Sequence, residues 1–480
     1  MAMAMAMYEP VKVYEQDSNG NGSNKTFMRY TNAGQDVELA IHIRGADVGV
    51  DGGDHGRVNE EKKSLILPTN SKHHHHHLQQ PLQQKSQRLA SLDVFRGLTV
   101  ALMILVDDAG GILPAINHSP WNGLTLADLV MPFFLFIVGV SLGLTYKRIP
   151  CKADATRKAV LRALKLLLLG LFLQGGFFHG LNDLSHGTDI QQMRWMGILQ
   201  RIAIAYLVGA LCEIWLKGGD LVCSEESLQR KYRFQGVIAL VLITIYLSLL
   251  YGLYVPDWEY RIPAGAPSSS AETFSVKCGA RGDTGPACNA AGMIDRAILG
   301  SHHLYRKPIY ARTEQCSINS PASGPLPTDA PSWCQAPFDP EGLLSSVMAI
   351  VTCLVGLHYG HIIVHFKDHR DRIRQWMIPS TCLLFLGVVL DLFGMHVNKA
   401  LYSLSYMCVT AGAAGILFSA IYMLVDVRGY RRITLVFEWM GMHALMIFIL
   451  AACNIIPIVL QGFYWKKPQN NILRLIGIGR

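Results

Sequence analysis

Long apolar segments alternate with short polar segments along most of the chain after residue 88. A helix needs about 20 predominantly apolar residues to cross the hydrocarbon core of a bilayer, and it satisfies its own backbone hydrogen bonds there. We therefore predict an all-α polytopic membrane protein, a bundle of about nine transmembrane helices. Their expected positions are residues 97–115, 124–146, 159–178, 196–216, 234–255, 342–364, 375–394, 401–425 and 433–455.

The composition agrees with this class. The 480 residues are 50% hydrophobic and only 16% charged, whereas a soluble protein would carry about a quarter charged residues. The net charge of +8 comes mainly from Lys and Arg between the apolar segments. Such charges report topology rather than nucleic-acid binding. We expect the lipid bilayer as a partner and no nucleic acid.

Basic residues gather in alternate loops, at residues 147–158, 230–233, 367–374 and 428–432. Because loops rich in Lys and Arg remain in the cytosol, these four loops and the N-terminus are predicted to be cytosolic. The loop near residue 118, residues 179–195 and the long loop 256–341 then face the opposite, non-cytosolic side. No apolar segment typical of a signal peptide opens the sequence.

The polar N-terminal region differs from the remainder of the chain. It is rich in Gly, Asn and Gln and contains a run of histidines at 73–77, so we expect a disordered cytosolic tail. Nothing around the histidines would fix a coordination geometry, and we predict no metal site. The predicted organisation is a tail at 1–88, five helices with a catalytic loop at 89–255, a cysteine-containing loop at 256–341, further helices at 342–465 and a C-terminal tail at 466–480.

Four of the 11 cysteines lie in the 256–341 loop. An even number of cysteines on the oxidising side predicts two disulfides, whose pairing the sequence leaves open. Zinc is a weaker alternative because the spacings form no paired CxxC motifs. The four residues are Cys278, Cys288, Cys316 and Cys334.

Chemically active side chains concentrate between residues 107 and 128, in a loop that joins the first two predicted helices. Ionisable groups beside membrane spans are costly and are functional candidates. A histidine near carboxylates has the properties of a general base. The purely structural alternative, in which the acids and Arg201 pair to make burial tolerable, fits the spacing equally well. The candidates are Asp107, Asp108, His118, Trp121, Asn122 and Asp128, with Gln200 and Arg201 at the start of the fourth predicted helix.

Several long segments point to a known family. They read RLASLDVFRGLTVALMILVDDAGG, HSPWNGLTLADLVMPFFLFIVG, GILQRIAIAY, CGARGDTGPACNAAGMIDRAILG, FDPEGLLSS and LYSLSYM, in this order between Arg88 and Trp465. Together they closely resemble the heparan-α-glucosaminide N-acetyltransferase family, in particular a plant-like member. The resemblance implies an enzyme that transfers acetyl from cytosolic acetyl-CoA, across a membrane, to the amine of a terminal glucosamine in the lumen.

The resemblance also implies roles for residues. The family's catalytic histidine precedes its WNGL motif and corresponds to His118, and the aspartate of ADLV corresponds to Asp128. Asp107 stands where the animal enzymes carry an asparagine, and an anion there would raise the basicity of His118 or fix its tautomer. His118 would act either as a direct base or as an acetyl carrier, and the sequence leaves both open.

The remaining candidates have two interpretations each. Trp121 is either a sugar-stacking face or an interfacial anchor, and Asn122 either binds an oxyanion or sugar hydroxyl or caps a helix. Arg201 binds a CoA phosphate or carboxylate, or neutralises Asp128. Gln200 lies beside Arg201 as a further substrate-binding candidate.

The resemblance leaves wider questions open. A plant-like protein would meet a different glycan acceptor, and a transporter or carrier of a sugar or lipid without acyl transfer is the alternative function. We expect a lysosome- or vacuole-like endomembrane or the plasma membrane, and a homodimer remains open. The family has a luminal region in place of the polar tail and one more helix after the ninth. The segment after Trp465 is too short for that helix, so we expect the C-terminus on the non-cytosolic side.

Overall fold

The computed structural model divides into two units, residues 1–88 and 89–480. It describes residues 8–16, 22–32, 35–39, 89–110, 116–174, 193–218, 222, 224–262, 272–305, 309–322 and 324–453. The histidine run at 73–77 and the C-terminal tail at 466–480 lie outside the described residues.

The first unit contains a three-stranded antiparallel sheet in the order β1-β2-β3. The strands are β1 (Tyr8–Gln16), β2 (Gly22–Asn32) and β3 (Gln35–Leu39). We expected a disordered tail from the composition, so these strands are a difference from the prediction. Their alternation of apolar and polar residues, with Val11 opposite Phe27 in the register, is typical of a strand. The low-complexity composition of the tail as a whole concealed this local pattern.

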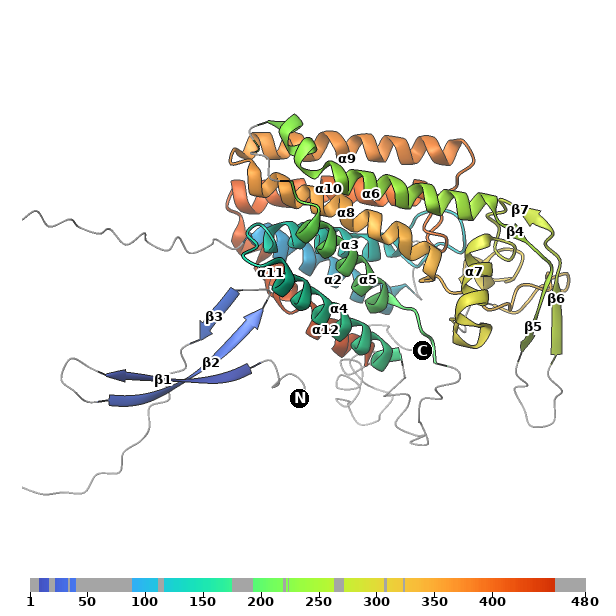
Figure 1. Ribbon diagram of the computed structural model, residues 1–480. Helices are drawn as coiled ribbons and strands as arrows, with labels where there is room; N and C mark the ends of the chain where they lie inside the picture. Colours follow the sequence, from blue (N-terminus) through green and yellow to red (C-terminus); the bar gives the residue numbers. More distant parts are fainter. Residues whose placement is uncertain are drawn as a thin grey trace, which may run out of the picture. The chain divides into compact units, whose positions relative to one another are not determined.

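The second unit is a bundle of helices that lie side by side along one direction (Figure 1). This confirms the predicted all-α polytopic class. The long helices are α2 (Ala90–Ala109), α3 (Leu126–Thr145), α4 (Lys152–Gln174), α5 (Ile198–Trp215), α6 (Glu225–Gly252), α8 (Leu343–His365), α9 (His369–Leu392) and α10 (Leu404–Tyr422). A π-helical turn, η4 (Met423–Val427), extends α10, and α11 (Arg431–Met442) and α12 (Ala444–Ala452) follow.

Each of the nine predicted spans coincides with a described helix or helix pair, but not all of them meet a composition test for crossing a bilayer. Among the described residues, six helices are long and apolar enough, namely α3, α5, α6, α8, α9 and α10 with η4. Helices α2 and α4 do not meet the test, because charged residues are spread along them, whereas those of α6 lie within its first nine residues. The predicted single span at 433–455 is replaced by α11 and α12, which are bent by 66° at their junction and make a seventh span only if taken together.

Glycines allow α3 and α8 to approach closely. Gly139 and Gly143 recur at the same four-residue spacing as Gly356 and Gly360. A Cβ atom at Gly139 would lie 2.0 Å from the carbonyl oxygen of Cys353, and one at Gly356 would lie 2.1 Å from that of Phe136. Small residues at this spacing let helix backbones meet inside a membrane. This contact sets the position of α3, whose first turn carries Asp128.

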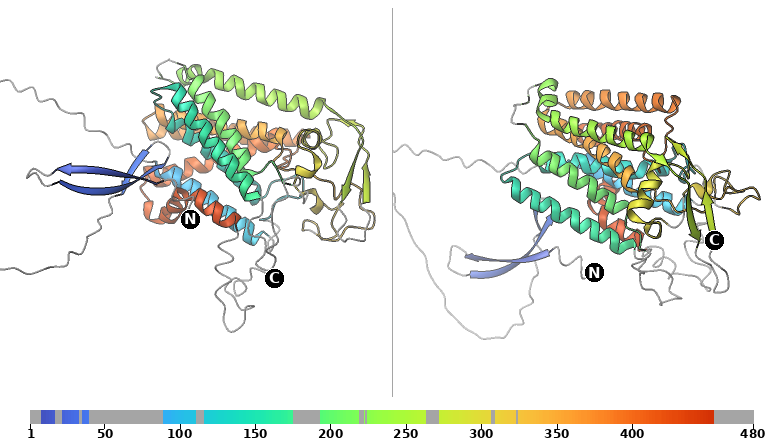
Figure 2. Two further views of the ribbon diagram at one scale, coloured as in Figure 1. Left: turned by 60° about the horizontal axis from the view of Figure 1, so that its bottom comes forward. Right: turned by 45° about the vertical axis from the view of Figure 1, so that its right-hand side comes forward.

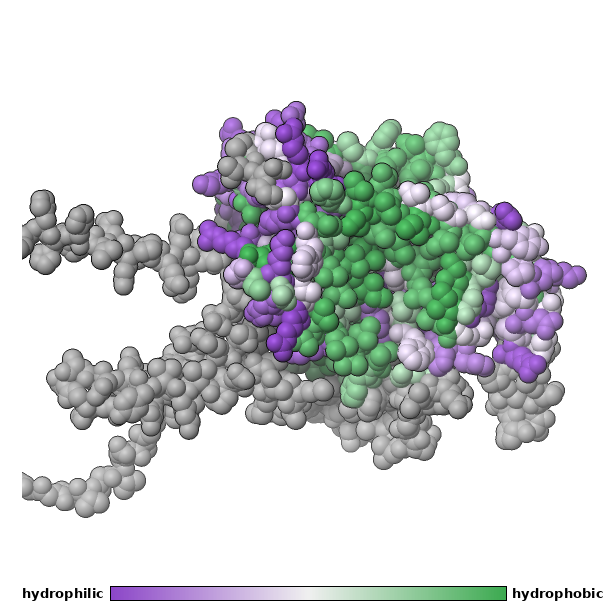
Figure 3. Space-filling model, in the orientation of Figure 1, coloured by the Kyte–Doolittle hydropathy of each residue, from purple (hydrophilic) through white to green (hydrophobic). Residues whose placement is uncertain are grey.

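The two ends of the bundle differ in chemistry. Figure 3 shows an apolar band across the helices with hydrophilic surface at both ends. The four basic loops, α3–α4, α5–α6, α8–α9 and α10–α11, gather at one end, and the 256–341 region lies at the other (Figures 1 and 2). The sequence predicts this arrangement, because basic residues occur in every second loop and such loops share one side of the membrane.

The 256–341 region is a small folded layer. Its strand β7 (Ala280–Arg281) pairs with β4 (Tyr254–Val255), which directly precedes the region, and β5 (Trp258–Ile262) pairs with β6 (Glu272–Val276). The region also contains α7 (Ala290–Leu299) and the short turns η2 (Ser301–His303) and η3 (Ile309–Arg312). Cys278 pairs with Cys288 and Cys316 pairs with Cys334. The prediction of two disulfides in this region is confirmed, and the structure supplies the pairing.

Candidate active site

The carboxylate of Asp128 is held at the start of α3. Thr125 precedes the helix, and both its backbone nitrogen and its hydroxyl donate to Oδ2 of Asp128, over 3.1 and 2.9 Å. The backbone nitrogen of Ser119 donates to the same oxygen over 3.2 Å. An acid in the first turn of a helix also interacts favourably with the helix dipole. Asp128 is completely buried, so its second oxygen points in a fixed direction.

That second oxygen contacts His118. The distance from Nδ1 of His118 to Oδ1 of Asp128 is 2.8 Å. Because an ionised carboxylate only accepts hydrogen bonds, the proton lies on Nδ1 and the lone pair lies on Nε2. The side chain of His118 is 37% exposed, so a reactant can approach the ring. Asp107 is an exposed residue in the last turn of α2, and the hydrogen bonds described for the His118 ring go to Asp128 and Lys399.

Lys399 is the second neighbour of the imidazole. Its Nζ lies 2.8 Å from Nδ1 and 3.2 Å from Nε2 of His118, and 3.6 Å from Oδ1 of Asp128. Because Nζ is at least as close to Nδ1 as to Nε2, the ammonium does not lie along the lone pair of Nε2, which points away from Nδ1. The guanidinium of Arg312 donates to the backbone carbonyl of His118. Three separate parts of the chain therefore meet at this histidine.

These neighbours change the protonation of the site. Burial, followed by the charge of Lys399, lowers the pKa of His118 below its ordinary value, although the hydrogen bond and the charge of Asp128 oppose the change. Burial likewise lowers the pKa of Lys399, against the opposite influence of Asp128 and Glu341. The neutral form of the His118 imidazole is therefore favoured.

Asn122 and Trp121 anchor the loop that carries His118. Asn122 is exposed and forms a backbone bridge with Asn398. Trp121 is buried, its Nε1 donates to the carbonyl oxygen of Thr284 over 3.0 Å, and its ring meets the edge of Phe338. These contacts tie the loop to the α9–α10 loop and to the 256–341 region. The roles of both residues in substrate binding remain predictions.

Arg201 lies near the site but does not share its contacts. It donates to the carbonyl oxygen of Pro340 over 2.9 Å and to the hydroxyl of Ser345. The guanidinium also lies over the ring of Tyr402, 5.5 Å from its centre. Arg201 thus joins α5 to the start of α8. Gln200 is buried, and neither polar atom of its carboxamide has a hydrogen-bond partner among the described residues.

Two acidic residues, Asp339 and Glu341, bind Arg194, and the charge of Glu341 acts on Lys399. Arg194 binds Asp339, with its Nε 2.8 Å from Oδ2, and also donates to Glu341. Burial would raise the pKa of Glu341, but the charges of Arg194, Arg201 and Lys399 overcome it and lower that pKa to about 2. Glu341 is therefore an anion that helps to balance the cations around the site.

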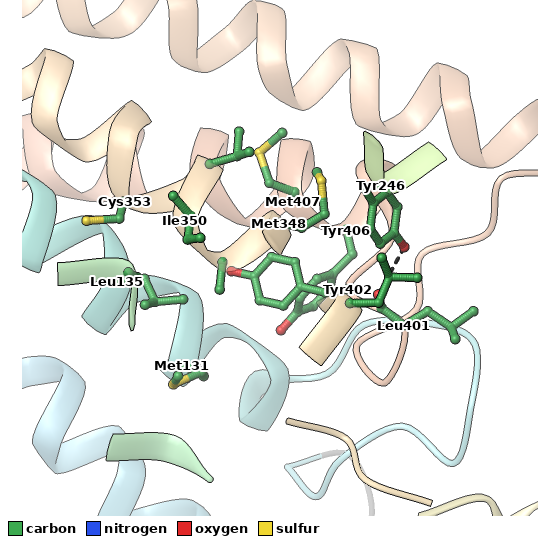
Figure 4. Packing of buried hydrophobic residues seen from close by; sticks show 14 of the residues in the cluster. Met131, Leu135, Tyr246, Met348, Ile350, Cys353, Leu401, Tyr402, Tyr406 and Met407 are labelled. Carbon is green, nitrogen blue, oxygen red and sulfur yellow. Dashed lines mark hydrogen bonds between the residues drawn. The ribbon is translucent and has the colours of Figure 1, made fainter. Parts of the chain in front are cut away.

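A layer of tyrosines supports the site from the bundle side. Figure 4 shows Tyr402 and Tyr406 packed close to Met348. The hydroxyl of Tyr406 donates to the backbone carbonyl of Asp128 over 2.6 Å, and that of Tyr246 donates to Leu401 over 2.9 Å. The loop with Lys399 and the first turn of α3 thus rest on one buried surface.

No cluster of three or more His, Cys, Asp or Glu side chains suited to a metal ion occurs among the residues that the structure describes. The expectation of a metal-free site remains a prediction.

Lys399, Arg312 and Glu341 were not among the sequence candidates. One signal pointed to Lys399, which is a basic residue in a loop predicted to be non-cytosolic, the side that disfavours positive charge. Nothing in the local sequence pairs it with His118, 281 positions away.

Part of the chain is similar in sequence to known proteins. Residues 88–223 match the family described as "Heparan-alpha-glucosaminide N-acetyltransferase, catalytic". Through this segment the chain is similar to that family. Two curated relatives of the same name are similar: one from Mus musculus is 32% identical over 394 residues, 77% of this chain and 54% of the relative. One from Homo sapiens is 30% identical over 406 residues, 80% of this chain and 55% of the relative.

The chain spans about half the length of these relatives. The matched segment, residues 88–223, contains His118, Asp128, Gln200 and Arg201. Lys399 and Arg312 lie outside it and reach the site only through the fold.

Proposed function

We propose that this protein is a transmembrane acetyltransferase that moves acetyl from acetyl-CoA to the amine of an amino sugar. The observation that carries the proposal is the His118–Asp128 pair, 2.8 Å apart, in the segment that matches the N-acetyltransferase family. A buried carboxylate that fixes one tautomer of a partly exposed imidazole is the arrangement that acyl transfer requires.

The chemistry follows from the free lone pair on Nε2. In a direct transfer, the amine attacks the thioester carbon, Nε2 accepts the ammonium proton, the C–N bond forms and the C–S bond breaks. The leaving thiolate then takes up a proton to give CoA. In a two-step transfer, Nε2 attacks the thioester carbon, the C–S bond breaks and the CoA thiolate leaves. The amine then attacks the acetyl carbon of the acetyl-imidazole, the C–Nε2 bond breaks, and the proton that the amine loses passes to the released imidazole or to the thiolate. Asp128 stabilises the positive charge that develops on the ring in both routes.

The two ends of the bundle suggest how the substrates approach. The basic loops α3–α4, α5–α6, α8–α9 and α10–α11 would attract the phosphates of CoA electrostatically, and positive loops are expected in the cytosol. His118 belongs to the opposite end, with the 256–341 region. We propose that the pantetheine arm extends through the bundle and that the acceptor binds on the non-cytosolic side, with the N-terminus in the cytosol. The membrane would be an endomembrane or the plasma membrane.

The test is acetyl transfer by the purified protein in detergent. Labelled acetyl-CoA is supplied with a panel of amino sugars and cell-wall oligosaccharides. We expect label on an amine acceptor, and His118→Ala should reduce the rate by at least about a hundredfold. His302→Ala is the matched control because His302 is exposed and lies in the same non-cytosolic region. Transfer that is absent with every acceptor, or equal in the His118 variant, overturns the proposal.

A second measurement separates the two routes. The protein is incubated with acetyl-CoA without acceptor, and CoA release and acetylation of the His118 peptide are measured by mass spectrometry. The two-step route predicts one equivalent of CoA and an acetylated His118 peptide. The direct route predicts neither until an amine is added.

A further inference from the structure

Lys399 is a largely buried residue that contacts the His118 imidazole. Its side chain is only 15% exposed, and its Nζ lies closer to both ring nitrogens of His118 than to the carboxylate of Asp128. A lysine whose only task was to neutralise Asp128 would contact the carboxylate first. The geometry instead directs the ammonium at the imidazole.

The loop around Lys399 is fixed on both sides. The backbone nitrogen of Gly123 donates to the carbonyl oxygen of Val397 over 2.8 Å, and Asn398 pairs with Asn122. After Lys399, Tyr402 has a left-handed φ of 53°, a conformation that a non-glycine residue keeps only when its surroundings hold it. Because both flanks are held, Lys399 keeps its place over the ring.

We propose that Lys399 is a positioning residue whose ammonium keeps the His118 imidazole unprotonated at mildly acidic pH. Its importance for catalysis rests on the proposed function, since a base or nucleophile must carry a free lone pair. A second proton on His118 would place two positive charges within hydrogen-bond distance in a partly buried site, which is unfavourable. Lys399 thereby extends the working range of the histidine toward acid.

The charges that face His118 have opposing effects. From α3, Asp128 favours the protonated ring, while Lys399 from the α9–α10 loop and Arg312 from η3 disfavour it. Glu341 acts on Lys399 and favours its charged form, and Asp107 is an exposed residue in the last turn of α2. Burial lowers the pKa of His118 most, and the charge of Lys399 is the next largest cause.

The decisive readout does not depend on acetyl transfer. Diethyl pyrocarbonate modifies only the neutral imidazole, so the rate at which the His118 peptide is labelled, followed by mass spectrometry across pH, reports the protonation of this ring. In the unaltered protein we expect a midpoint below 6.5, the ordinary pKa of histidine. In Lys399→Gln we expect the midpoint to rise by about one unit or more.

Two variants provide controls. Lys399→Arg keeps the charge and should keep the midpoint low. Lys277→Gln removes an exposed lysine from the same side of the protein and should leave the midpoint unchanged. A midpoint of 6.5 or above in the unaltered protein overturns the proposal without any variant. An unchanged midpoint in a folded Lys399→Gln protein, as judged by its melting temperature, overturns it as well.

The pH dependence of acetyl transfer is the second readout. In Lys399→Gln the acid limb of the kcat/KM profile should move upward with the labelling midpoint. A chain that shows the labelling shift but transfers no acetyl would refute the proposed function and support the electrostatic assignment. A protein that transfers acetyl but shows no labelling shift in Lys399→Gln would support the proposed function and refute the electrostatic role of Lys399.

Discussion

Asn398 donates from its Nδ2 to Oδ1 of Asn122 over 3.1 Å, although 276 positions separate the two residues. Their backbones also form an isolated antiparallel bridge. Oδ1 of Asn398 accepts from the backbone nitrogen of Leu401 over 2.9 Å. One buried carboxamide thus holds the His118 loop against the loop that carries Lys399.

Asn398→Ala should loosen both loops at once. The variant leaves the backbone nitrogen of Leu401 without its partner, and an unsatisfied buried donor costs about 1–3 kcal/mol. We expect a lower melting temperature together with a reduced rate of acetyl transfer. Asn319→Ala, at an exposed position of the same side, serves as the control. A normal melting temperature and rate in the Asn398 variant would show that the bridge is dispensable.

Asp128→Asn should impair transfer more than it impairs folding. Asparagine keeps the size of the side chain, but it can donate to Nδ1 and so favour the wrong tautomer of His118. We expect the rate to fall by at least about a hundredfold, with about 1 kcal/mol lost from the start of α3. Asp154→Asn, at an exposed residue of α4, is the matched control. The measurement is the initial rate of folded protein, and a loss below tenfold would contradict the assigned role.

Gly356→Ala should separate α3 from α8. The added Cβ would meet the carbonyl oxygen of Phe136 at 2.1 Å, and overpacking of this kind costs about 1–3 kcal/mol. Gly236→Ala tests the same change on α6, where no atom lies within 4 Å of the added Cβ. Thermal unfolding in detergent should therefore show a loss only in the Gly356 variant, and equal curves would refute the close contact.

Cys316→Ser should destabilise the 256–341 region. The Cys316–Cys334 pair closes a segment with a sequence separation of 18, and loops of this size gain about 3 kcal/mol from a disulfide. Cys151→Ser, at an exposed free cysteine, should have no effect. Peptide mapping without reduction should recover Cys278 with Cys288 and Cys316 with Cys334. Maleimide labelling of all four in unreduced, denatured protein would contradict the pairing.

Asp295 should make stability depend on pH. Burial raises the pKa of Asp295 in α7 to about 7, above its ordinary value of 3.8. The folded state therefore binds the proton more tightly than the unfolded state, and the associated stability is lost as pH rises from about 4 to about 7. Asp295→Asn mimics the neutral form, so its melting temperature should exceed that of the unaltered protein more at pH 8 than at pH 5. A constant difference would show that Asp295 titrates normally.

Much of the architecture follows from the sequence because it depends on local composition. Apolar length marked a helix at each of the nine predicted spans, basic residues marked the alternate loops that gather at one end, and four cysteines marked the disulfide-containing region. The family motifs likewise pointed to His118 and Asp128, which lie only ten positions apart and within one loop and the helix after it.

The tertiary structure decided which distant groups share the site. Lys399 and Arg312 contact His118 although they lie 281 and 194 positions away in the sequence. A local sequence pattern does not predict contacts between residues so far apart. The sequence also did not predict the bend between α11 and α12 or the pairing of the cysteines, because both depend on tertiary contacts. A helix needs only its own residues to satisfy its backbone, whereas the protonation of a histidine depends on every charge that the fold brings within a few ångströms.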